Sequence, residues 1–148
     1  ILKDETKSIR QGKQIVSAET SHAINLMLRK VVSLNEGTAN FADVKGYEVS
    51  GKTGSSVKYG NNAKLNTFVS LFPASKPKYV LLVMLDEPKS APNFVYEMPS
   101  TNKFPNGYKY KGETRNTSGW NTVVVAGKII EKIGPILAIN DLQASKNF

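Results

Sequence analysis

The sequence contains no cysteine and only one histidine, His22. The lack of cysteine excludes a disulfide framework, a thiol nucleophile and a cysteine-ligated zinc site, and a single histidine excludes a metal site built from several histidines. Long apolar runs are also missing, because the longest, residues 79–85, is far shorter than the roughly 20 residues of a membrane-spanning helix. Residues 1–5 do not have the pattern of a signal peptide. Since the chain does not begin with methionine, we expect it to be a mature or cut piece of a longer protein.

Acidic residues are outnumbered by basic ones. The 148 residues include 20 Lys and Arg against 12 Asp and Glu, a formal charge of +8. Basic chains with interleaved aromatic residues can bind nucleic acid, but here the charges are dispersed over predicted strands and loops, without a Lys/Arg run. We therefore expect no nucleic-acid partner and interpret the charge as a solvated basic surface near an anionic polymer or membrane.

Two segments have the spacing of amphipathic helices. The first is predicted over residues 18–34, where Ser17 is placed to cap the N-terminus. The second is predicted over residues 121–137, with Pro135 bending or ending it in the last turn. Residues 138–148 are expected to form a fraying tail, and the chain is divided into a domain portion, 1–140, and a C-terminal tail, 141–148.

Three segments between these helices are predicted as strands. Residues 47–50 alternate apolar and polar and run into the glycine-bracketed segment 51–54. Residues 65–72 and 79–86 follow after short connections, which favour an antiparallel meander. The continuous apolar run of 79–86 predicts a central strand buried on both faces, whereas residues 87–119 show no clear element. The expected fold class is α/β, an antiparallel sheet flanked by helices.

The tripeptide Lys52-Thr53-Gly54 is the feature that points to chemistry. A K-[ST]-G tripeptide arises by chance in roughly one chain in fifteen of this length, and alone it could be an exposed lysine beside a glycine bulge. Here it follows a half-buried strand pattern and precedes two further strands. In that setting K-T-G is one of the motifs of penicillin-recognising serine enzymes.

The stretch of residues 46–56 around this tripeptide resembles the third active-site motif of class B penicillin-binding proteins. Further blocks resemble the same family in the same order, namely residues 31–32, 36–39, 67–74, 77–88 and 119–121. The resemblance as a whole extends over about residues 10–137. Within the family the similarity is greatest to the division-specific septal D,D-transpeptidases, which cross-link peptidoglycan. The resemblance implies the C-terminal portion of a penicillin-binding-protein/β-lactamase-like transpeptidase fold, with no metal or organic cofactor.

The resemblance also implies roles for four consecutive residues. Lys52 would supply positive charge near the catalytic serine and the substrate carboxylate, and Thr53 would donate its hydroxyl to that carboxylate. Gly54, without a Cβ, would let the substrate backbone approach the strand edge. The backbone N–H of Ser55, where the family usually has threonine, would form part of the oxyanion hole.

The family nucleophile, the serine of an S-x-x-K motif at the start of a buried helix, has no counterpart here. Three S-x-x-K strings occur, at 55–58, 75–78 and 100–103, but none lies in a predicted helix that would bring serine and lysine together. The string 33–35 fits the S-x-N motif by letters only. We therefore expect both serines to lie upstream of this chain and the chain alone to be inactive.

The implied activity is acyl transfer on the D-Ala-D-Ala end of a peptidoglycan stem peptide through a serine acyl-enzyme. Implied partners are stem peptides, β-lactam antibiotics, the upstream part of the same protein, and division and cell-wall synthesis proteins. The implied location is the periplasmic face of the inner membrane, with the anchor outside this chain. A carboxypeptidase, a β-lactamase-like enzyme, a penicillin sensor or a non-catalytic wall- or division-binding module remain alternatives.

Three other candidate features are interpreted as structural. His22 is expected to be a solvated or capping histidine, and Asp86 with Glu87 to form a turn rather than an acid/base pair. The aromatic residues of the 94–120 segment are expected to anchor a loop rather than to form a ligand cage: Phe94, Tyr96, Phe104, Tyr108, Tyr110 and Trp120.

Overall fold

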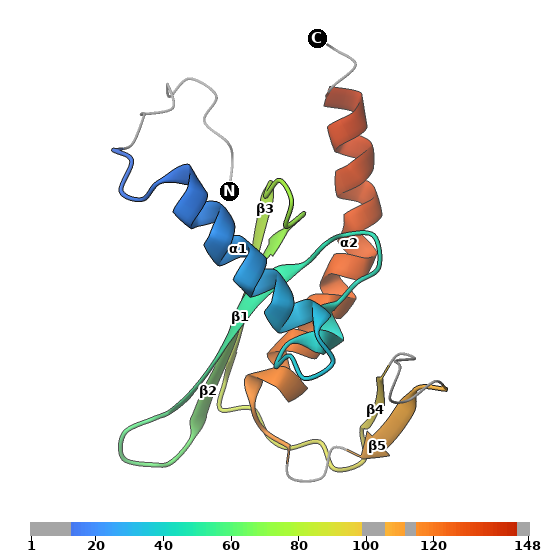
Figure 1. Ribbon diagram of the computed structural model, residues 1–148. Helices are drawn as coiled ribbons and strands as arrows, with labels where there is room; N and C mark the ends of the chain where they lie inside the picture. Colours follow the sequence, from blue (N-terminus) through green and yellow to red (C-terminus); the bar gives the residue numbers. More distant parts are fainter. Residues whose placement is uncertain (1–12, 99–105, 112–114, 145–148) are drawn as a thin grey trace.

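The structure is a computed structural model that describes residues 13–98, 106–111 and 115–144. Its elements in chain order are α1 (Ala18–Ser33), η1 (Asn40–Ala42), β1 (Ser50–Val57), β2 (Lys64–Phe72), β3 (Tyr79–Asp86), β4 (Val95–Met98), β5 (Tyr108–Lys111), η2 (Ser118–Trp120) and α2 (Thr122–Ala144), where η denotes a short 3-10 helix. Strands β1 to β3 form one antiparallel sheet against which α1 and α2 pack, and β4 and β5 form a separate hairpin (Figure 1). The predicted α/β class is confirmed.

Helix α1 begins where the sequence predicts. The N–H of Thr20 donates to Ser17 Oγ at 3.0 Å, which satisfies one of the free N–H groups of the first turn. The C-terminal part of the helix enters the core through Val32, which is fully buried. Arg29 links the same part of the helix to the residue after η1, since its Nη2 forms an ion pair with Asp43 Oδ1 at 2.8 Å.

Strand β1 begins at Ser50, so the prediction of a strand from Tyr47 is wrong. The backbone just before β1 is left-handed, with φ of 89° at Gly46 and 46° at Glu48, and neither value is compatible with an extended strand. The strand instead continues through the motif, and residues 52–54 all pair with residues of β2. The tripeptide is therefore held in a regular ladder.

Strand β3 lies at the edge of the described sheet, because the strand order is β1-β2-β3. The prediction of a central strand buried on both faces is wrong. Val83 is buried against the core, whereas Val80, Leu82 and Met84 on the other face are 69%, 54% and 54% exposed. An apolar run shows that both faces of a strand are apolar, but the neighbours that cover each face are set by tertiary structure.

One hydrophobic core lies between the sheet, the end of α1 and α2. Its buried members are Val32, Ala39, Ala42, Val49, Phe68, Phe72, Val83, Val123, Ala126 and Ile130. Phe68 stands at its centre, and its ring lies directly under β1, because a Cβ added at Gly51 would come within 2.7 Å of that ring. The core therefore supports the strand that carries the motif.

Helix α2 continues through Pro135 to Ala144, so the tail predicted over 138–148 is wrong for residues 138–144; residues 145–148 lie outside the described part. The distal turns are fastened to β3 because Asp141 accepts hydrogen bonds from Lys78 Nζ and Tyr79 Oη, each at 2.8 Å. These two donors, Lys78 first, lower the pKa of Asp141. None of the described helices is long and apolar enough to cross a membrane.

The prediction that residues 87–119 contain no clear element is wrong, because β4 and β5 form a short antiparallel hairpin there. Tyr96 of β4 is buried and packs against Phe41 of η1 and Trp120 of η2, with ring centroids 5.5 and 5.0 Å away. The aromatic residues described in this segment are therefore anchors, as predicted. Phe104 and the side chains of Tyr108 and Tyr110 lie outside the described part.

Candidate active site

The four predicted site residues lie on β1, which is the edge strand opposite β3 in the described sheet. Lys52 is exposed, and its Nζ donates to the backbone oxygen of Thr53 at 2.8 Å. Thr53 Oγ1 lies 3.1 Å from Thr38 Oγ1, a hydroxyl that the sequence reasoning did not assign to the site. The motif thus presents an ammonium group and a pair of hydroxyls.

The peptide between Gly54 and Ser55 has a defined orientation. The Gly54 carbonyl oxygen accepts hydrogen bonds from Ser118 Oγ and, at 3.4 Å, from Thr67 Oγ1 of β2, so it points towards the interior of the sheet. In a trans peptide the N–H points opposite to the C=O. The Ser55 N–H therefore points away from β2, towards the free edge of β1, where it can donate to the oxygen of a bound molecule.

The direction of backbone groups alternates along a strand, so the Thr53 carbonyl points to the same free edge as the Ser55 N–H. Lys52 Nζ is bonded to that carbonyl and is consequently placed at this edge. The structure therefore brings together a cation, a backbone N–H and the Thr53 backbone along one side of β1. This is the chemistry needed to hold a carboxylate-bearing peptide and to stabilise a developing negative charge on its carbonyl.

The hydroxyl of Ser55 does not face this edge. It lies 2.9 Å from Ser118 Oγ and accepts a hydrogen bond from the Ser118 N–H at 3.0 Å. Ser118 belongs to η2, 63 residues away in the chain, and the sequence reasoning did not assign it to the site. The only signal was the adjacent block 119–121, which resembles the family. A Cβ at Gly119 would lie 2.7 Å from Thr38 O, so η2 and Thr38 border the motif together.

The S-x-x-K strings in the described residues lack the geometry of a nucleophile. The string at 55–58 starts on β1, where residues three apart point to opposite faces of the sheet. The string at 75–78 connects β2 and β3, and the string at 100–103 lies outside the described part. Ser33 is the last residue of α1. These observations agree with the rejection of the strings at 55–58, 75–78 and 33–35, and the rejection of the string at 100–103 stays a prediction.

The acidic pair Asp86 and Glu87 has an ion-pair partner. Lys58 Nζ lies 3.0 Å from Glu87 Oε1 and also pairs with Asp86. Lys58 lowers the pKa of Glu87, which fits an ion-paired turn between β1 and β3. His22 is exposed on α1. Among the described residues, no group of three His, Cys, Asp or Glu side chains could hold a metal ion.

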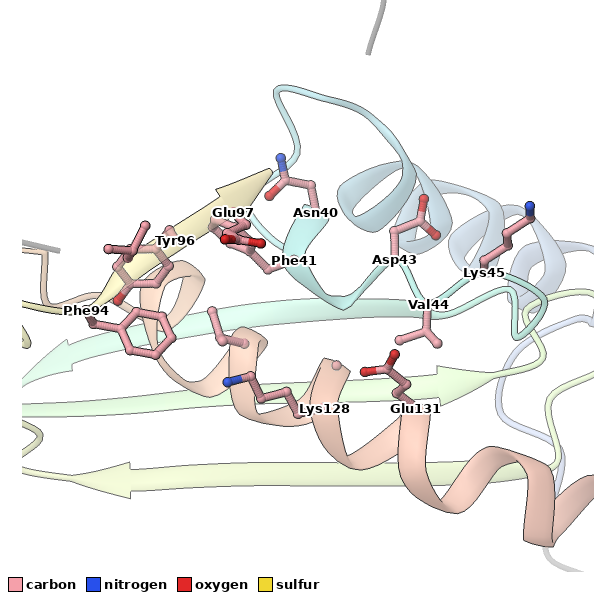
Figure 2. Close-up of a pocket in the computed structure, with 13 residues that line it drawn as sticks. Asn40, Phe41, Asp43, Val44, Lys45, Phe94, Tyr96, Glu97, Lys128 and Glu131 are labelled. Carbon is pink, nitrogen blue, oxygen red and sulfur yellow. The ribbon is translucent and has the colours of Figure 1, made fainter. Parts of the chain in front are cut away.

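A groove of about 620 Å³ opens between η1, β4 and α2 and does not include the motif (Figure 2). Phe41, Phe94 and Tyr96 provide its aromatic wall. Two of its charged side chains already have partners. Asp43 forms an ion pair with Arg29, and Lys128 makes a cation–π contact with Phe94, its Nζ lying 5.2 Å from the ring centre. The groove is lined by charges of both signs and by none of residues 52–55, and we place the candidate site at the edge of β1.

Comparison with known proteins decides the family. The family described as penicillin binding protein transpeptidase domain matches residues 1–104. The chain belongs to this transpeptidase family. The resemblance seen in the sequence motifs is thereby confirmed.

Individual relatives point to the same family. The probable peptidoglycan D,D-transpeptidase FtsI of Caulobacter vibrioides is 30% identical over 141 residues, which cover 87% of this chain and 21% of that protein. Stage V sporulation protein D of Bacillus subtilis is 40% identical over 87 residues, covering 55% of this chain and 13% of that protein. The chain therefore spans about a fifth or less of the curated relatives it matches.

The fold is shared with a solved transpeptidase domain. The D,D-transpeptidase domain of a peptidoglycan glycosyltransferase from Eggerthella lenta matches with a TM-score of 0.52 and 21% identity, covering 80% of this chain and 21% of that chain. The predicted transpeptidase-like architecture is therefore confirmed for the described part.

Proposed function

We propose that this chain is the C-terminal part of a serine D,D-transpeptidase that cross-links peptidoglycan at the division septum. The observation that carries the proposal is the edge of β1, where Lys52 Nζ and the Ser55 N–H face the same side. Family membership and the names of the relatives support the reaction class. The nucleophilic serine is proposed to come from a part of the protein outside residues 1–148.

The proposed reaction has two acyl-transfer steps. The serine oxygen bonds to the carbonyl carbon of the penultimate D-Ala, the C–N bond to the last D-Ala breaks, and that D-Ala leaves with a proton on its amino group. An amino group of a second stem peptide then attacks the ester, forms the cross-linking amide and restores the serine hydroxyl. A β-lactam would acylate the same serine.

In this scheme the residues of β1 bind and stabilise. Lys52 attracts the terminal carboxylate of the stem peptide and raises the positive potential at the serine. The Thr53 hydroxyl, next to that of Thr38, donates to the same carboxylate. Gly54 keeps the strand edge accessible to the substrate backbone. The Ser55 N–H stabilises the oxyanion of each tetrahedral intermediate.

The exposed second face of the sheet supports the proposal that the chain is part of a larger fold. Val69, Val80, Leu82 and Met84, which are 41–69% exposed, lie together on this face because their strands pair in register. A contiguous apolar surface of this kind usually marks an interface. We propose that the upstream part of the protein covers it. The complete protein would act on the periplasmic side of the inner membrane, together with division and cell-wall synthesis proteins.

The test is the product formed by the complete protein from a stem peptide ending in D-Ala-D-Ala, with a second stem peptide as amine acceptor. We expect a cross-linked dimer and one released D-Ala per cross-link, both abolished by benzylpenicillin and absent with an L-Ala-L-Ala peptide. Release of D-Ala without a dimer would instead indicate a carboxypeptidase. A protein that releases no D-Ala would contradict the proposed function and favour the non-catalytic module.

A further inference from the structure

Ser118 lies behind the motif strand and is nearly fully buried, with 1% of its surface exposed. Its Oγ bonds to the carbonyl oxygen of Gly54, and its N–H donates to Ser55 Oγ at 3.0 Å. The first partner is the carbonyl of the peptide unit that presents the Ser55 N–H at the free edge of β1, and the second is the side chain of Ser55. Ser118 therefore touches the back of the group that faces the substrate in the proposed reaction.

The protons of this cluster can be assigned from the chemistry of its atoms. A carbonyl oxygen only accepts, so the single hydroxyl proton of Ser118 must go to Gly54 O. The contact of 2.9 Å between the two hydroxyl oxygens is then made by the Ser55 proton, which Ser55 donates to Ser118 Oγ. The chain of donation runs from Ser55 Oγ to Ser118 Oγ to Gly54 O. Each donation in such a chain strengthens the next.

We propose that Ser118 is a positioning residue for the oxyanion hole: its hydroxyl fixes and polarises the Gly54–Ser55 peptide so that the Ser55 N–H is held towards the reacting carbonyl. The inference rests on the proposed function. A peptide whose oxygen accepts strong hydrogen bonds is a better donor at its nitrogen, because the two groups share one resonance system. Ser118 acts through this peptide and does not touch substrate.

The position of Ser118 is itself fixed from two sides. Its backbone oxygen accepts a hydrogen bond from Thr122 Oγ1 at 3.1 Å, at the start of α2. Trp120, in the same turn of η2, packs edge-on against Tyr96 with ring centroids 5.0 Å apart. The hydroxyl of Ser118 is thus held by a well-packed turn. The Gly54–Ser55 peptide is therefore preorganised by a side chain whose position is fixed.

The test compares acylation by benzylpenicillin in the complete protein and in three variants. In Ser118→Ala we expect the rate constant of acylation to fall about tenfold, less than the loss of a direct oxyanion donor, while the dissociation constant of the precovalent complex is unchanged. Ser118→Thr, which keeps a hydroxyl, should recover most of the rate. Ser70→Ala removes another buried serine hydroxyl, which donates to Leu81 O of β3 at 3.1 Å, and serves as the structural control. It should lower the melting temperature without slowing acylation.

Two results would overturn the inference while leaving the proposed function intact. One is acylation of Ser118→Ala at the parent rate. The other is an equal loss of precovalent binding and acylation in Ser118→Ala and Ser70→Ala, which would show that Ser118 only stabilises the fold. Absence of acylation in the parent protein would overturn the inference together with the proposed function.

Discussion

Replacing Lys52 by alanine in the complete protein is expected to slow acylation by benzylpenicillin by about a hundredfold or more, the range seen when one electrostatic stabiliser of an acyl-transfer site is removed. Lys52 is the cation that the structure places at the free edge of β1, next to the Thr53 carbonyl. Its charge is proposed to attract the carboxylate that both penicillins and stem peptides carry. The measurement is the second-order rate constant of acylation by stopped-flow fluorescence.

The matched control for this prediction is Lys58→Ala. Lys58 follows the same strand by one residue, but its ammonium is paired with Asp86 and Glu87 away from the motif. We expect this variant to be acylated at the parent rate, since surface ion pairs contribute little to the site or to stability. If both lysine variants lose activity equally, the role of Lys52 is not specific. Parent-like acylation of Lys52→Ala would rule out the proposed site at β1.

Replacing Phe68 by alanine is expected to lower the free energy of unfolding of the domain by about 3–5 kcal/mol, as for other large buried aromatic side chains. Phe68 is fully buried in the central strand β2, and its register partners are Thr53 of β1 and Val83 of β3. Loss of the ring would leave a cavity directly under Gly51 and the motif. Since domains are stable by only about 5–15 kcal/mol, the loss is large. Urea unfolding followed by tryptophan fluorescence measures it.

The conservative variant Phe68→Leu is the control for this prediction. It keeps most of the buried apolar volume, and we expect it to cost about 1.5 kcal/mol or less. A cost below about 1 kcal/mol for Phe68→Ala would show that the ring does not support β1 as the packing indicates. The structure predicts that stability rises from Phe68→Ala to Phe68→Leu to the parent protein.

Local signals in the sequence predicted the parts of the fold that local physics decides. Helix α1 was predictable because Ser17 supplies a side-chain cap and the apolar residues repeat at helical spacing. The meander of β1, β2 and β3 was predictable because its connections are short. The end of α2 was not, because Asp141 holds the helix to Lys78 and Tyr79 through contacts more than 60 residues apart in the chain.

The residues of the candidate site likewise fall into those that local sequence predicts and those that only the tertiary fold brings together. Four adjacent residues, 52–55, were predictable because they form one contiguous motif on one strand. Ser118 and Thr38 were not. Thr38 lies in the block 36–39 and Ser118 beside the block 119–121, but neither block assigns a role to a side chain, and each residue reaches β1 only through the tertiary fold. The placement of β3 at the edge was likewise undecidable, since Val80, Leu82 and Met84 have the same apolar character whether or not another segment covers them.

The most direct test is the mass-spectrometric mapping of the residue that benzylpenicillin acylates in the complete protein. We expect one penicilloyl group per chain, on a serine outside residues 1–148 that is followed three residues later by lysine. An adduct on a serine of this chain, such as Ser55 or Ser75, or the absence of any adduct, would contradict this expectation.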